Sequence, residues 1–275
     1  MMEIYSPFII NAIIGIILGG IASLIVGSLS MLRGVHYLAA EVTHAALGGA
    51  AIGALIYDKV KFEPIFFIMA LTFSILTSIV TGYIVRERGV ESSGMAIGVS
   101  LAISLSIYAI IIGLIRSELI IRVNSYLLSD ILLITYSDII NMTIISIIGL
   151  LTLLFLHREF IYICFDLEGT EAMGLKTNLY DYLIFTLIGA LGVVIAKAMG
   201  ALLVFALAIV PASCSMEISK STDRIFIYTF LISISSGIIG LWMSIILNLP
   251  TSGLIAITAV TIYVIVKVLK KIPLK

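Results

Sequence analysis

Long apolar runs separated by short polar breaks follow one another along the whole chain. A run of about 18 or more apolar residues is long enough to cross the hydrocarbon core of a membrane as a helix. The pattern predicts nine helices, with eight to ten as the range, because two runs meet around Lys197 with almost no polar break. The expected helices cover residues 7–31, 36–57, 63–85, 93–115, 138–157, 181–197, 199–216, 225–247 and 251–269. The expected fold is therefore an all-α, polytopic transmembrane helix bundle.

Composition agrees with a membrane protein. Hydrophobic residues make up 61% of the 275 positions and charged residues 12%, about half the charged share of a soluble domain. We therefore expect residues 1–275 to form a single transmembrane domain. The 16 basic and 16 acidic residues cancel, which leaves no charge-based reason to expect nucleic acid as a partner. Cys164 and Cys214 are too far apart to suggest a disulfide framework or a zinc site.

The distribution of Lys and Arg predicts an orientation. With nine crossings and a cytoplasmic carboxyl terminus, the amino terminus lies outside, and basic residues divide eleven to five in favour of the inside. The inside set is Arg33, Arg86, Arg88, Arg158, Lys176, Lys220, Arg224, Lys267, Lys270, Lys271 and Lys275, and the outside set is Lys59, Lys61, Arg116, Arg122 and Lys197. Cytoplasmic loops carry the excess of positive charge, so the bias supports a multi-pass protein of the cell membrane in this orientation.

Small-residue pairs predict close packing between helices. Three GxxxG pairs occur in the expected helices: Gly15/Gly19, Gly49/Gly53 and Gly94/Gly98. Such pairs let helix backbones approach each other closely in lipid. For any single pair, a glycine that is merely tolerated is an equally good interpretation.

Glu41 and His44 are the best candidates for chemistry inside the membrane. Ionisable groups are costly in hydrocarbon, so one near the middle of a helix suggests a functional site. The two residues are three positions apart in the second expected helix and share a helical face. A carboxylate and an imidazole so placed can bind a divalent transition metal, or they can simply pair with each other. We expect Thr43, between them, to bond a carbonyl one turn back.

Residues 195–213 contain a second candidate element. Pro211 has no N–H to donate to the carbonyl of Leu207, which predicts a bend and a carbonyl free to bond elsewhere. A simple kink is the structural interpretation, and a carbonyl that lines a gate or an ion path is the functional one. Lys197 is expected to extend to the outer surface.

The only long cytoplasmic loop, residues 158–181, has the pattern of a short helix. Asp166 is suited to cap it and Gly174 to end it. An amphipathic helix on the membrane face is suited to dock a soluble partner, although the composition also fits a solvated loop. No GxxxxGK[ST] phosphate loop occurs, so this chain does not hydrolyse ATP by that route. HExxH and GxSxG are absent as well.

These stretches together resemble the permease subunits of ATP-binding-cassette importers for zinc, manganese or iron(II). The family pattern G-D-x-x-S-H-A-x-x-x-G is similar to Ala39–Gly49, with its histidine at His44 and its acidic residue at Ala40 rather than Glu41. A second family pattern, which runs from a lysine through a glycine and a proline to an arginine, is similar to Lys197–Met216 and ends on Met216. The other matches are Phe165, Asp166, Glu168 and Gly174 of the cytoplasmic loop, Tyr126–Leu132 with Asp138, and Leu249–Gly253.

The resemblance implies a type II importer permease that forms a homodimer in the lipid membrane. Its expected partners are two cytoplasmic ATPase subunits and an extracellular metal-binding protein. It implies no resident cofactor, only a transported divalent metal ion. By residue, it implies metal contact at His44, with Glu41 as a neighbouring acid. It also implies ATPase docking at Phe165, Asp166, Glu168, Glu171 and Gly174, and a gating or pathway role for Lys197, Gly200 and Pro211.

Two other classes of protein remain open on the residues alone. In a secondary transporter driven by an ion gradient, Glu41 would carry a coupling proton. Such transporters more often show internal repeats with interrupted helices, and no clear repeat is present here. A membrane scaffold without transport activity is the third class, and the polar centre of the second helix argues against it.

Overall fold

A computed structural model describes residues 7–125, 130–200 and 204–271 of the chain, and within them the regular elements are all helical. Within these described residues, eight helices are long and apolar enough to cross a membrane. They are α1 (Pro7–Leu32), α2 (Leu38–Val60), α3 (Ile65–Arg88), α4 (Ser93–Ile112), α6 (Tyr136–Phe155), α9 (Thr177–Met199), α11 (Thr222–Leu247) and α12 (Thr251–Lys271). The all-α transmembrane bundle expected from the sequence is confirmed.

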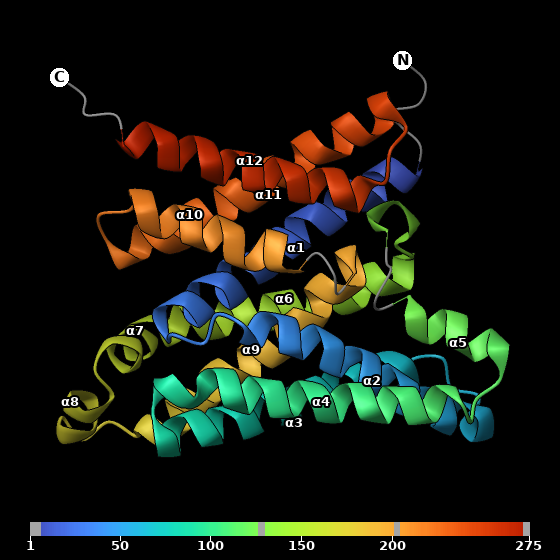
Figure 1. The fold of residues 1–275 in the computed structure, drawn as a ribbon, viewed down its shortest axis with the longest axis horizontal. Helices are drawn as coiled ribbons and strands as arrows, with labels where there is room; N and C mark the ends of the chain where they lie inside the picture. Colours follow the sequence, from blue (N-terminus) through green and yellow to red (C-terminus); the bar gives the residue numbers. More distant parts are fainter. Residues whose placement is uncertain (1–6, 126–129, 201–203, 272–275) are drawn as a thin grey trace.

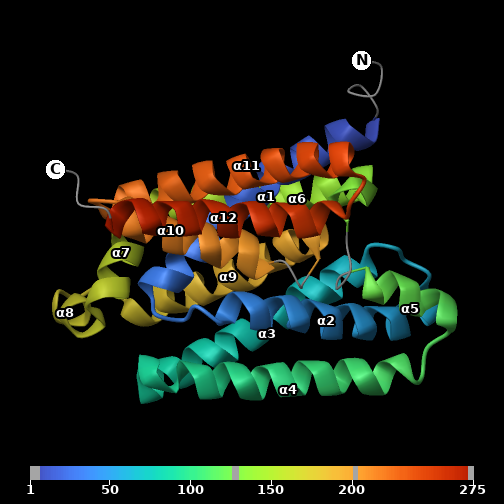
Figure 2. The same cartoon turned by 45° about the horizontal axis from the view of Figure 1, so that its top comes forward.

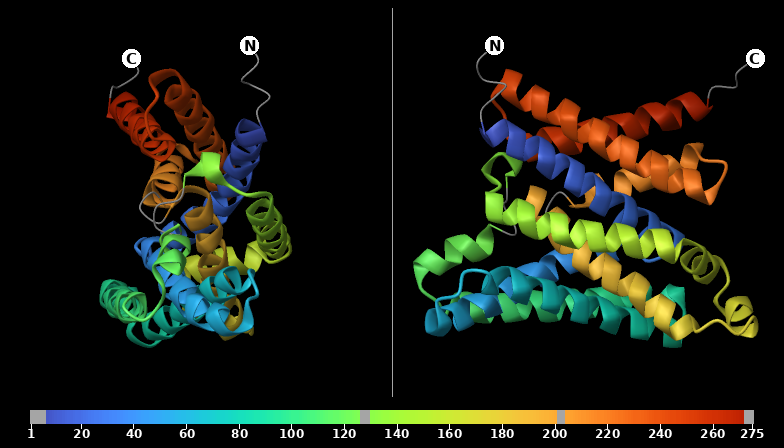
Figure 3. Two further views of the ribbon diagram at one scale, coloured as in Figure 1. Left: turned by 90° about the vertical axis from the view of Figure 1, so that its right-hand side faces the viewer. Right: turned by 180° about the vertical axis from the view of Figure 1, so that it is seen from behind.

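Shorter helices lie at the two ends of the bundle and distinguish one end from the other. Helix α5 (Ser117–Asn124) lies at one end, whereas α7 (His157–Phe165) and α8 (Leu167–Ala172) lie at the other (Figure 1). We call these the α5 end and the α8 end. Helix α1 begins at the α5 end and α12 finishes at the α8 end, and the view from behind shows the same arrangement (Figure 3). The first and last helices thus start and finish at opposite ends, as the predicted orientation requires.

The expected helix at 199–216 is where the structure differs from the nine-helix prediction. Helix α9 ends at Gly200, whose φ is +82°, a left-handed value that glycine adopts at low cost. A π-turn at Phe205–Ile209 leads into α10 (Val210–Ile218), which runs back toward the α8 end and is too short to be a full span. Residues 201–203 lie outside the described residues. Eight long helices plus this short one keep the count within the predicted range.

Helices α2 and α3 pack together through small residues on α2. Gly49 lies against Ala70 of α3 and Gly53 lies against Phe66, so that a side-chain carbon at either position would meet the α3 backbone. The Gly49/Gly53 pair therefore packs as expected. Gly94 and Gly98 of α4, by contrast, have nothing within 4 Å of a would-be Cβ. That third pair makes no close helix contact within the protomer.

The helices form two groups on either side of α9. Helices α2, α3 and α4 pack on one another, and α1, α11 and α12 form the other group (Figure 2). Helix α9 contacts α1 from one group and α2 and α3 from the other. This arrangement places the metal-site candidates of α2 in the first group and joins them to α8 through α9.

Candidate functional site

His44 lies in the second turn of the membrane-spanning helix α2 and is half-buried. Its Nδ1 is 2.8 Å from the carbonyl oxygen of Ala40, one turn earlier. Because a carbonyl only accepts hydrogen bonds, Nδ1 carries the proton, and Nε2 keeps a lone pair that can bind a metal. Thr43 donates to the same carbonyl at 2.8 Å, as the sequence predicted.

The imidazole lies on the open side of α2. Ala40 and His44 are both partly exposed, whereas their neighbours Ala39, Val42 and Ala45 are fully buried. The two residues therefore mark a face of the helix that no other part of the described protomer covers completely.

Glu41 points elsewhere. Its side chain is completely buried, and neither carboxylate oxygen has a hydrogen-bond partner among the described residues. The group lies toward Thr77 of α3. The structure therefore does not bring Glu41 and His44 to a common exposed face, although both belong to the same helix.

The described part of the chain does not gather several metal ligands around His44. Among the residues that the structure describes, no three His, Cys, Asp or Glu side chains are grouped so that they could hold a metal ion. His44 is thus a single, partly exposed candidate ligand. A transport path needs ligands that are few and exchangeable.

Residues 158–181 contain the short capped helix that their sequence pattern predicted. Asp166 caps α8 by accepting a 2.8 Å hydrogen bond from the N–H of Gly169, and Gly174 follows the helix with φ of +83°. The five residues predicted to dock an ATPase are all exposed at the α8 end: Phe165, Asp166, Glu168, Glu171 and Gly174. This end therefore offers an aromatic ring and carboxylates to a soluble partner.

A buried ion cluster beside α8 is a feature that the sequence reasoning missed. Arg33 binds Asp181 through two parallel hydrogen bonds of 2.9 and 3.1 Å, and the two side chains are 7% and 1% exposed. Arg86 lies 3.7 Å from the same carboxylate and 3.8 Å from Glu171. In the sequence, Arg33 and Arg86 counted only as two of the basic residues assigned to the inside. The one signal that could have indicated the cluster was Asp181, an acidic residue near the start of α9.

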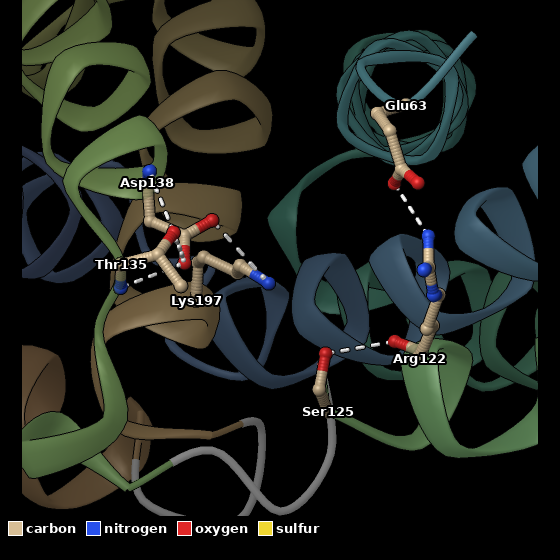
Figure 4. A network of polar contacts seen from close by, with 6 residues as sticks. All are labelled: Glu63, Arg122, Ser125, Thr135, Asp138 and Lys197. Atoms are coloured by element: carbon tan, nitrogen blue, oxygen red, sulfur yellow. Dashed lines mark hydrogen bonds and ion pairs between the residues drawn. The ribbon is translucent and has the colours of Figure 1, made fainter.

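Lys197 lies in the wall of a cavity at the α5 end rather than beside His44. Its Nζ is 3.5 Å from Oδ1 of Asp138, which also forms a capping box with Thr135 at the start of α6 (Figure 4). The cavity is about 580 Å³, and Glu63 and Arg122 form an ion pair on its opposite wall. The hydrogen bond from Arg122 lowers the pKa of Glu63 below its usual range.

Pro211 lies at the start of α10, and the carbonyl that it leaves free is bonded to a neighbouring helix. The carbonyl of Leu207, which Pro211 leaves without a helical donor, accepts a 3.1 Å hydrogen bond from the Ser233 hydroxyl of α11. Gly200 ends α9. The freed carbonyl is thus bonded to a neighbouring helix, as the structural interpretation requires. The gating roles of Gly200 and Pro211 stay predictions, and residues 126–129 of the Tyr126–Leu132 match lie outside the described residues.

A bundle of apolar helices, with a partly exposed histidine in the second turn of one spanning helix and a short helix with exposed residues at one end, fits the class of membrane-embedded transport subunits. The family model for the ABC 3 transport family matches residues 5–270, and the chain belongs to this family. It is a permease subunit of an ATP-binding-cassette transporter. The resemblance seen in the sequence is confirmed.

Relatives cover nearly the whole chain. The manganese import system permease protein ScaB of Streptococcus gordonii is 26% identical over 258 residues, which are 94% of this chain and 90% of the relative. The manganese transport system membrane protein MntC of Listeria monocytogenes is 27% identical, again over 94% of this chain. Among solved structures, PsaBC from Streptococcus pneumoniae in complex with Fab is similar, with a TM-score of 0.80 and 26% identity over 95% of this chain and 91% of that one.

Proposed function

We propose that this chain is the translocation subunit of an ATP-driven importer of divalent transition-metal ions, with Mn²⁺ as the preferred cargo. The partly exposed imidazole of His44, held with Nε2 available for a metal, is the observation that carries the proposal. Manganese is chosen among the candidates because the relatives with similar chains are named as manganese transporters. Imidazole with oxygen ligands and water is chemically compatible with Mn²⁺.

The working unit in this proposal is a homodimer. A two-fold axis along the membrane normal would bring the open α2 faces of two copies together, and each would contribute one His44. Two imidazoles plus water hold an ion more loosely than a closed set of four protein ligands, which suits transport. Glu41 becomes a further ligand only in a conformation that separates α2 from α3, since its carboxylate is buried between them.

The remaining partners follow from the two ends of the bundle. Cytoplasmic ATPase subunits would bind the exposed segment around α8, and an extracellular metal-binding protein would deliver the ion at the α5 end. The basic residues that the sequence assigned to the inside include Arg33, Arg86 and Arg224, which lie at helix ends on the α8 side. This distribution supports a cytoplasmic α8 end.

A secondary transporter was the alternative on the residues alone, and membership of the ABC 3 transport family argues against it. One observation nonetheless bears on this alternative. Glu41 is a buried carboxylate without a hydrogen-bond partner among the described residues, and such a group is suited to carry a proton across the membrane. In that case a proton gradient would drive metal uptake without ATP.

Reconstitution separates the two functions. Purified permease is placed in vesicles with its ATPase and its metal-binding protein, and Mn²⁺ uptake is measured with ATP or with an imposed proton gradient. We expect uptake only with ATP, and loss of that uptake in His44→Ala. The matched control is His157→Ala, a histidine in α7 at the α8 end. Uptake driven by the gradient alone would support the alternative, and normal uptake by His44→Ala would remove this residue from the path.

A further inference from the structure

The partly buried ion cluster at the α8 end joins segments that are far apart in the sequence. Arg33 follows the last residue of α1, Arg86 is in the last turn of α3, and Asp181 is in the second turn of α9. Glu171 belongs to α8 itself. Formal charges cancel across the four side chains, because two guanidinium groups face two carboxylates. We call these four residues the joint.

Strong, directional contacts hold the four residues of the joint together. Arg33 and Asp181 form a bidentate pair with both side chains buried, which is the most directional form of arginine–carboxylate contact. Arg86 adds a 3.0 Å hydrogen bond to the hydroxyl of Thr177 in the first turn of α9. Removing one partner from a buried pair leaves an uncompensated charge, which is strongly unfavourable. The ends of α1, α3 and α9 are therefore held together as one unit.

The backbone segment that connects the joint to α2, the helix that carries His44, is short and has a defined path. Gly34, with φ of +77°, ends α1, while Val35 donates to Ser30 at 2.9 Å and Gly34 donates to Met31 at 3.3 Å. This is the Schellman pattern of helix termination, which fixes the backbone path. Helix α2 begins at Leu38, so His44 lies within its second turn. A displacement of Arg33 is thus passed directly into α2.

From this geometry we infer that the joint is the mechanical link that carries movement of α8 to the helix bearing His44. Arg33 and Asp181 are positioning residues in this inference, and they act through α2 rather than on the metal. The inference rests on the proposed function, because it assumes that an ATPase moves α8. Glu171, 64% exposed, is the member of the joint that an ATPase docked on α8 can reach.

The first test measures coupling rather than activity alone. In the reconstituted transporter, ATP hydrolysis and Mn²⁺ uptake are recorded in the same vesicles for the wild type, Asp181→Asn and Arg33→Lys. We expect hydrolysis to persist, while the Mn²⁺ moved per ATP falls by roughly fivefold or more, the lower range of coupling between sites. Arg88→Lys is the matched control, because Arg88 is an exposed arginine at the same end of α3. A wild-type ratio in Asp181→Asn overturns the inference.

Arg33→Lys decides the question if Asp181→Asn does not yield a folded complex. Lysine keeps the positive charge but cannot make the two parallel hydrogen bonds of the guanidinium fork. A wild-type ratio of Mn²⁺ to ATP in Arg33→Lys then counts against the joint, and a reduced ratio supports it.

The second test follows the helices themselves. Spin labels are placed at Tyr37 and Met173, which are 61% and 65% exposed, in a chain whose cysteines, Cys164 and Cys214, are replaced by alanine. With an intact joint, the distance between the labels stays constant when ATP is trapped, because α8 and α2 move together. In Arg33→Lys the distance shifts or broadens, and an unchanged distance overturns the inference. If wild-type vesicles moved no Mn²⁺, the proposed function would fail, yet this distance measurement would still report on the joint.

Discussion

His44 donates a hydrogen bond from Nδ1 to the carbonyl oxygen of Ala40, the residue one turn before it in α2. The two residues share the partly exposed face of this helix. Position 40 is also where the resembling family pattern has its acidic residue. An acid introduced there would lie directly beside the available Nε2 of His44.

Ala40→Asp is therefore expected to tighten metal binding. The new carboxylate and the imidazole can bind one Mn²⁺ together, and we expect its dissociation constant to fall by roughly tenfold, equivalent to about 1.4 kcal/mol. Isothermal titration calorimetry on the purified permease measures this change. Ala40→Asn, which has the same shape but no charge, is the matched control. Equal affinities in the two variants would show that position 40 does not face the ion.

Glu41→Met is expected to stabilise the protein and impair transport. Methionine has a similar volume and removes a buried carboxylate that has no hydrogen-bond partner among the described residues, so the free energy of unfolding should rise by roughly 1–3 kcal/mol. Unfolding in detergent micelles measures the stability, and vesicle uptake measures the function. Glu87→Met, at an exposed position near the end of α3, serves as the control. A stable variant with full uptake would leave Glu41 with no part in transport.

The length of the apolar runs was enough to predict the helices, but it could not show whether the Glu41 side chain is buried. The spans follow from the local sequence alone, because a helix must be long enough to cross the hydrocarbon. Glu41 and His44 are three residues apart, but whether each is buried depends on where α3 packs, and that is decided by contacts such as Gly49 against Ala70. Arg33 and Asp181 are 148 residues apart, so no local pattern reveals their pairing.

Gly174→Pro should prevent assembly with the ATPase. Gly174 has φ of +83°, whereas proline is fixed near −65°, so the backbone after α8 must change its path. We expect the permease to fold and enter the membrane but to lose co-purification with the ATPase. Asn178→Pro changes an exposed residue in the first turn of α9, a position that tolerates proline, and should retain the complex. Co-purification of Gly174→Pro at the wild-type level would rule out this segment as the contact.

Acid should weaken the ion pair between Glu63 and Arg122 in the wall of the cavity at the α5 end. The pKa of Glu63 is lowered from its ordinary value of 4.5 by the hydrogen bond from Arg122, so the carboxylate stabilises the folded state above that pH. The contribution is lost as the pH falls below 4.5 and through the folded pKa. Because the pair is exposed, the effect is small. The melting temperature of the wild type should therefore fall slightly more steeply in acid than that of Glu63→Gln, and parallel profiles would contradict the assignment.

Gly49→Ala and Gly98→Ala form a matched pair that tests how α2 packs on α3. A Cβ at Gly49 would lie 2.8 Å from the Cα of Ala70 and closer still to the carbonyl oxygen of Met69, so two backbones would have to separate. Overpacking of this kind costs about 1–3 kcal/mol. At Gly98 nothing lies within 4 Å, and alanine gains up to about 1 kcal/mol from its higher helix propensity. Unfolding in mixed micelles should therefore show changes of opposite sign. A loss of the same size in both variants would mean that the close approach of α2 and α3 at Gly49 does not stabilise the fold.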